Sequence, residues 1–210
     1  MLDLVIKNCK LIDENGEFNI GVDDGKITEI TKENLKAEKT IDIKSNYLLS
    51  GFIDPHVHFR DPGFTYKEDI EMGARASARG GFTSVVMMGN TNPHMDNVET
   101  IKYVLEKGAK TGINVYTCAN VTMNMEGKAQ VDMEKLLDAG AVLFTDDGKP
   151  ITDENIMEAV CRKAAALDKG VSLHEENPKF ITDNGINAGA VAEKLGIKGS
   201  PREAEISMVK

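Results

Sequence analysis

Residues 51–60 read Gly51-Phe52-Ile53-Asp54-Pro55-His56-Val57-His58-Phe59-Arg60. A glycine precedes an apolar, strand-like run, and the run ends in polar residues. The pattern recurs about every thirty residues along the chain. The glycines are Gly51, Gly81, Gly112, Gly140 and Gly170, and the apolar runs that follow begin at Phe52, Phe82, Ile113, Ala141 and Val171. A repeat of this kind predicts successive β/α units.

Helical patterns lie between these runs, and glycine just past a helix end is a common stop signal. Alternating strands and helices build a parallel sheet with right-handed crossovers. The absence of Gly-x-Gly-x-x-Gly after the first strand argues against a doubly wound dinucleotide fold and favours a (β/α)8 barrel. A whole barrel takes about 250 residues, so residues 51–210 should supply about five of its eight units. The expected helices are Lys67 to Arg79, Val98 to Lys107, Val131 to Asp138, Thr152 to Leu167 and Arg202 to Lys210, with a loop or short helix over Gly185 to Pro201.

The first fifty residues carry a different pattern, in which apolar and polar residues alternate with the period of a β-strand. Asn15-Gly16 and Asp24-Gly25 are hairpin-turn pairs. We expect residues 1–50 to form a small β-meander or β-sandwich segment and residues 51–210 to form the partial barrel. The strand-like stretches are Leu2 to Ile6, Lys26 to Ile30 and Thr40 to Ile43.

The composition excludes several classes of protein. With 34 acidic against 25 basic residues the net charge is −9, which disfavours nucleic acid as a partner. Cys9, Cys118 and Cys161 lie far apart and form no Cys-x-x-Cys pair, so a disulfide framework is not expected. No stretch approaches the run of about 20 apolar residues that spans a membrane. A cytoplasmic location is the default expectation.

His56 and His58 form the strongest chemical signal. Residues i and i+2 of a strand point to the same face, and at the carboxyl end of a barrel strand that face opens on the active-site mouth. Two imidazoles placed in this way can bind one metal ion. The alternative is a pair of structural histidines on a turn.

The ends of later strands bring possible partners to the same mouth. Asp146 and Asp147 follow the fourth expected strand, and His174 follows the fifth. Asn90 follows the second. An acidic pair before glycine is also common in turns and helix caps, and asparagine before proline is common in turns. Arg60 could bind a carboxylate with two hydrogen bonds, or it could form a surface salt bridge.

Four stretches together resemble the bacterial dihydroorotases of the amidohydrolase superfamily. They are His56 to Gly63 (HVHFRDPG), Gly80 to Pro93 (GGFTSVVMMGNTNP), Phe144 to Gly148 (FTDDG) and His174 to Asn177 (HEEN). The resemblance implies a zinc-dependent, reversible hydrolysis of the cyclic amide of dihydroorotate to carbamoyl aspartate, a step of pyrimidine synthesis. A related cyclic amidase, such as a hydantoinase, dihydropyrimidinase or allantoinase, is the first alternative. A silent homologue that scaffolds aspartate transcarbamoylase is the second.

The resemblance also implies roles for single residues. One or two zinc ions would be held by His56 and His58, by His174, and by Asp147 as a bridge; Asp146 and a carboxylated Lys149 are the alternatives to Asp147. His58, Arg60 and Asn90 would bind the substrate.

Two departures from the family pattern matter. Gly89 stands where the family commonly has proline, which should loosen the loop that carries Asn90. A further histidine ligand and the acid/base aspartate are expected beyond residue 210, so the 210-residue chain alone should be inactive. A homo-oligomer is expected.

Overall fold

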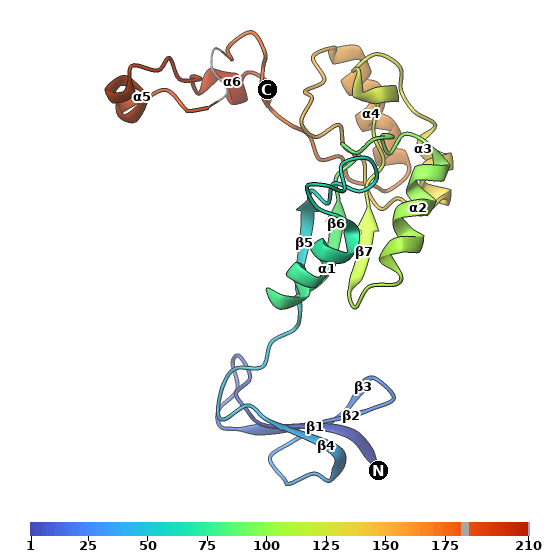
Figure 1. The fold of residues 1–210 in the computed structure, drawn as a ribbon, viewed down its shortest axis with the longest axis vertical. Coiled ribbons are helices and arrows are strands. Elements are labelled where there is room, and N and C mark those ends of the chain that lie inside the picture. The colour runs from blue at the N-terminus through green and yellow to red at the C-terminus, as the bar shows by residue number, and fades with distance from the viewer. Residues whose placement is uncertain (182–184, 210) are drawn as a thin grey trace. The chain divides into compact units, whose positions relative to one another are not determined.

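The structure is a computed structural model that describes residues 1–181 and 185–209. The chain divides into two compact units, Met1–Gly51 and Phe52–Lys210. Figure 1 shows the elements of each unit in chain order.

The first unit is one four-stranded sheet. Its strands are β1 (Leu2–Cys9), β2 (Phe18–Asp23), β3 (Lys26–Thr31) and β4 (Ala37–Asp42), in the order β3-β2-β1-β4. The turn at Asp24-Gly25 joins β2 to β3 as predicted, with φ of 48° and 69°. The prediction of a plain meander is wrong, because β4 pairs with β1 in parallel. Residues 1–51 form a single layer, so they contain no sandwich by themselves.

The second unit is α/β and begins with three parallel strands. They are β5 (Phe52–Val57), β6 (Phe82–Met87) and β7 (Asn114–Thr117), in the order β5-β6-β7. Helix α1 (Ile70–Arg79) follows β5 and helix α2 (Val98–Gly108) follows β6. Figure 1 shows the three strands side by side, with both helices beside them. Each helix starts at a residue whose side chain caps it: Asp69 accepts from Met72 N at 2.8 Å and Asn97 from Thr100 N at 2.9 Å.

The fourth and fifth expected strands are shorter than predicted. Phe144 makes single parallel bridges to Ala119 and to Val171, in place of full strands. The order of neighbours is nevertheless as predicted, since Thr145 N donates to Ala119 O at 2.9 Å and Ser172 N donates to Phe144 O at 2.9 Å. A short segment with so few ladder partners does not extend into a regular strand.

The remaining helices lie within the predicted helical ranges, apart from a 3-10 turn that the sequence did not predict. They are the 3-10 turn η1 (Met123–Met125), α3 (Met133–Asp138), α4 (Glu154–Ala166), α5 (Ala190–Leu195) and α6 (Glu203–Ile206). The last of them is a single turn, shorter than the expected Arg202 to Lys210. Residue 210 lies outside the described residues. Within residues 1–181 and 185–209, no helix combines the length and the apolar composition needed to cross a lipid bilayer.

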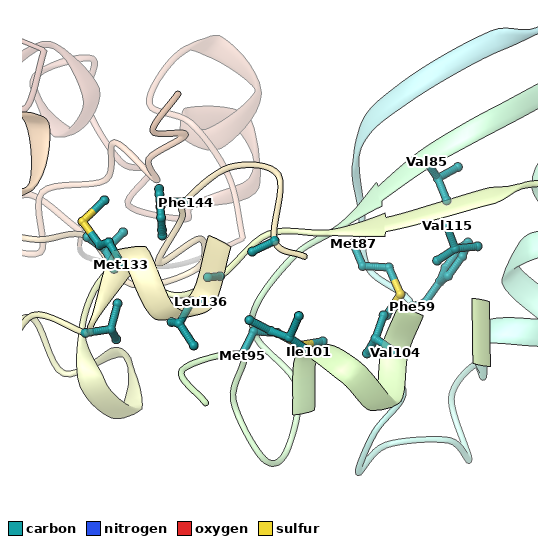
Figure 2. Close-up of a cluster of buried hydrophobic side chains, with 14 of the residues drawn as sticks. Phe59, Val85, Met87, Met95, Ile101, Val104, Val115, Met133, Leu136 and Phe144 are labelled. Carbon is teal, nitrogen blue, oxygen red and sulfur yellow. The ribbon is translucent and has the colours of Figure 1, made fainter. Parts of the chain in front are cut away.

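The core of the second unit joins its strands to its helices. Met87 of β6 and Ile101 and Val104 of α2 are fully buried in one cluster, and Phe144 and Met133 continue the cluster toward α3 (Figure 2). This packing holds the strands in place. The predicted site residues lie at the carboxyl ends of these strands.

Candidate metal and substrate site

At the end of β5, successive side chains point alternately into the core and into a cavity. Val57 and Phe59 belong to the core cluster, whereas His56, His58 and Arg60 line a cavity of about 1060 Å³. Phe59 is 5% exposed and lies against Gly73 of α1. A methyl group on Gly73 would come within 2.3 Å of the phenyl ring, so glycine is needed there for the helix to approach.

His56, His58 and Asp147 form a compact group. The two Nε2 atoms are 3.2 Å apart, and Asp147 Oδ2 lies 3.4 Å from that of His56 and 3.2 Å from that of His58. Two imidazole nitrogens at this separation need a proton or a cation between their lone pairs. The Asp147 side chain is only 10% exposed, whereas those of His56 and His58 are 42% and 32% exposed. The carboxylate therefore lies at the buried end of the group. The group could hold a metal ion.

His174 approaches the other oxygen of the same carboxylate. Its Nδ1 lies 3.4 Å from Asp147 Oδ1, and its Nε2 lies 3.1 Å from Glu176 Oε2. Asp147 therefore offers one oxygen to the pair from β5 and the other to His174. A carboxylate shared in this way can bridge two cations.

Asp146 faces away from this group. It is 1% exposed, and its carboxylate accepts hydrogen bonds from Val121 N at 2.8 Å, Thr122 N at 3.2 Å and Thr122 Oγ1 at 2.5 Å. Lys149 is exposed, and its backbone N donates to Asp146 O at 2.9 Å. Neither residue is among those that line the cavity.

Asn90 connects a histidine to Arg60. Its Oδ1 lies 3.1 Å from His58 Nδ1 and 3.5 Å from Arg60 Nη1. If His58 donates its Nδ1 proton to this oxygen, the unprotonated Nε2 faces Asp147.

Gly89 packs closely against a buried residue, and the expectation that it loosens the loop of Asn90 stays a prediction. Gly89 is buried, and a methyl group there would come within 2.4 Å of Asn120 Nδ2. Asn120 is fully buried and donates to Thr145 O at 3.1 Å, two residues before Asp147. Sequence reasoning missed Asn120, because a single asparagine after a strand carries no signal of this contact.

Glu175 and Glu176 also line the cavity. Burial raises the pKa of Glu175, and the charge of His174 partly opposes this rise. The sequence showed both residues beside His174 but gave no reason to assign them a role.

Residues 45–209 match the family model described as dihydro-orotase-like. The chain belongs to this dihydro-orotase-like family. It is 48% identical to a dihydroorotase of Clostridioides difficile over 98% of this chain and 50% of that protein. It is 42% identical to a dihydroorotase of Aquifex aeolicus over the same shares of the two chains. The chain thus spans about half the length of the curated relatives it matches.

Solved structures agree on the fold, and these neighbours are amidohydrolase TIM-barrel proteins. An L-hydantoinase from Arthrobacter aurescens matches with a TM-score of 0.73 and 24% identity, over 86% of this chain and 42% of that one. A D-hydantoinase matches with a TM-score of 0.67 and 26% identity, over 85% and 41%. The dihydro-orotase-like chain therefore has an α/β fold that matches part of these barrel proteins.

Proposed function

We propose that this protein acts as a zinc-dependent dihydroorotase, which reversibly hydrolyses the ring amide of (S)-dihydroorotate to N-carbamoyl-L-aspartate in pyrimidine synthesis. The observation that carries the proposal is the position of Arg60. It lines the same cavity as the histidine–aspartate group and contacts Asn90. A guanidinium beside a metal group suits a substrate that bears a carboxylate close to the amide to be cut. Relatives named dihydroorotase support the proposal.

The proposed metal ligands are His56, His58, Asp147 and His174. Imidazole nitrogen and carboxylate oxygen are donors that zinc prefers, and one or two ions would suit this set. When bound, zinc lowers the pKa of its water and polarises a carbonyl group. Asp147 is proposed as the bridge in preference to Asp146 or Lys149.

The chain's own residues would orient the substrate. Arg60 and Asn90 would bind its carboxylate, and His58 would contact both the metal and the substrate. Asn90 has one oxygen that already faces His58 and Arg60, so its amide nitrogen is the atom available to a substrate oxygen. No residue of this chain is assigned as the general acid or base.

The competing function is that of another cyclic amidase, such as a hydantoinase. The hydantoinase structures match the fold of this chain, so the fold alone does not distinguish the two functions. Arg60 separates the two, because hydantoin and dihydrouracil carry no carboxylate for it to bind. A silent scaffold is disfavoured, since it has no need to keep the four metal-binding side chains together.

Substrate assays on the protein as its gene encodes it test the proposal. Dihydroorotate should be the preferred substrate over hydantoin and dihydrouracil. Arg60→Ala should mainly raise KM, whereas His58→Ala should abolish metal-dependent turnover. Arg79→Ala, which changes an exposed arginine at the end of α1, is the matched control. Preference for hydantoin, or an unchanged KM in Arg60→Ala, would overturn the assignment.

Three broader points are also proposed. Residues 1–50 would form one layer of a composite sandwich, and residues 51–210 the first part of the barrel. The protein would be a cytoplasmic homo-oligomer, with aspartate transcarbamoylase as a further partner. Light scattering of the purified protein, with and without that partner, tests the assembly.

A further inference from the structure

Asp61, the residue after Arg60, is a fully buried carboxylate. Three groups donate hydrogen bonds to it. Lys107 Nζ lies 2.5 Å from Oδ2, Tyr103 OH lies 2.9 Å from Oδ1 and Ile70 N lies 3.3 Å from Oδ2. The first two come from α2 and the third from the start of α1. One carboxylate thus ties the loop after β5 to both helices.

The charges of this cluster reinforce one another. Burial alone would raise the pKa of Asp61, but the hydrogen bonds from Lys107, Tyr103 and Ile70 N outweigh it and leave the pKa lowered. The hydrogen bond to Asp61 raises the pKa of Lys107. Asp61 is therefore ionised and paired at neutral pH. The carboxylate of Asp61 is fully buried, whereas the Lys107 side chain is 35% exposed, so the pair lies at the edge of the core and connects the loop after β5 to α2.

A directional role for the pair follows from the alternation along the loop. The side chains of residues 57 and 59 point into the core and that of residue 61 points toward α2, whereas those of residues 56, 58 and 60 line the cavity. Phe59 is fixed against Gly73, and Asp61 is fixed by α2, so the backbone on both sides of Arg60 is anchored. The backbone of Arg60 is also held, since Phe64 N donates to Arg60 O at 2.8 Å.

The side chain of Arg60 is held less firmly. Its contact with Asn90 Oδ1 is 3.5 Å long, at the limit of a hydrogen bond. The direction of the guanidinium therefore depends mainly on the anchored backbone from which the side chain extends.

We propose that Asp61, Tyr103 and Lys107 form a positioning unit that aims Arg60 into the cavity and so sets the affinity for the substrate's carboxylate. The inference rests on the proposed dihydroorotase function. None of the three residues lines the cavity, so the unit acts through Arg60 and not on the substrate.

Lys107→Met and Tyr103→Phe test the unit in the protein as its gene encodes it. Methionine keeps an unbranched stem of similar length but removes the cation, and phenylalanine removes only the hydroxyl. We expect Lys107→Met to raise KM for dihydroorotate about tenfold and Tyr103→Phe about threefold, with kcat and zinc per chain nearly unchanged. Lys102→Met, at an exposed position of the same helix, is the control and should leave KM unchanged.

A double-mutant cycle separates positioning from general structural damage. In the Arg60→Ala background, Lys107→Met should raise KM no further, because the group that it positions is gone. A further rise equal to that in the wild-type background, or a fall in kcat and zinc content in place of the KM effect, would overturn the inference. If Lys107→Met does not fold, the same cycle is run with Tyr103→Phe. Wild-type protein that does not turn over dihydroorotate would overturn the proposed function and this inference with it, whereas additive effects would overturn this inference alone.

Discussion

Asparagine in place of Asp146 should destabilise the protein, whereas asparagine in place of Asp147 should remove metal binding. The two carboxylates are adjacent in the sequence but face different surroundings. That of Asp146 accepts hydrogen bonds from Val121 N, Thr122 N and Thr122 Oγ1. That of Asp147 faces three imidazoles.

The magnitude for Asp146 follows from its buried donors. An amide retains one oxygen acceptor and turns an NH2 group toward at least one donor, which is left unsatisfied. A hydrogen bond to a charged group contributes about 1.5–3 kcal/mol, and a buried unsatisfied donor costs about 1–3 kcal/mol. Asp146→Asn should therefore lower the free energy of unfolding by about 2–4 kcal/mol, a large share of the roughly 5–15 kcal/mol of a typical domain.

For Asp147→Asn we expect the opposite balance, with a small effect on stability and a large effect on zinc binding. In the metal-free protein its partners are three imidazoles that are 32–42% exposed, so its loss should lower the free energy of unfolding less than the loss of Asp146 does. Its loss should weaken zinc binding at least about a hundredfold, since removal of even an outer-shell partner costs roughly 10–100-fold.

Urea unfolding of metal-free protein, followed by circular dichroism, measures the first effect, and zinc per chain after dialysis measures the second. Asp138→Asn, at an exposed position of α3, is the control. The reasoning is refuted if Asp147→Asn keeps its zinc, or if Asp146→Asn unfolds at the wild-type urea concentration.

Three further predictions concern the loop of Asn90, the buried carboxylate and the isolated chain. Gly89→Ala should lower stability by about 1–3 kcal/mol through overlap with Asn120, measured as a lower Tm; an unchanged Tm would contradict the contact. Because its pKa is lowered, Asp61 contributes stability above its unfolded pKa and loses it as pH falls through the folded value, so Asp61→Asn should flatten the acid limb of stability against pH. An equally steep acid limb in this variant would argue against an ionised Asp61. A polypeptide of residues 1–210 alone should be inactive and should associate, since Phe52 and Ile53 of β5 are 50% and 69% exposed; a monomer by light scattering that hydrolyses dihydroorotate would contradict this.

The repeat of glycine and apolar run predicted β5, β6 and β7. In β6 and β7 the apolar pattern reflects burial, since Val85, Met87 and Val115 belong to the core, whereas most of β5 is exposed. Strand length at Phe144 and Val171 could not be predicted in the same way, since it depends on the neighbouring segment as much as on the strand itself. Strand β2 was missed because Gly21 interrupts its apolar pattern. In the structure that glycine leaves room for Leu2, which a methyl group would approach within 2.8 Å.

The site was predictable to the extent that strand ends converge. The sequence brought His56, His58, His174 and the acidic pair to one mouth, because parallel strands end on the same edge. It could not distinguish Asp146 from Asp147 on chemistry alone. The distinction comes from Val121 and Thr122, which are 25 and 24 residues away from Asp146 in the chain and meet it only after folding.

Turnover of dihydroorotate as a function of bound zinc tests the central claim most directly. Protein stripped of metal by a chelator and dialysed should be inactive, and activity should return in proportion to the zinc taken up per chain. Undiminished turnover by protein shown by elemental analysis to be free of metal would contradict the account, as would full zinc loading with no turnover of dihydroorotate.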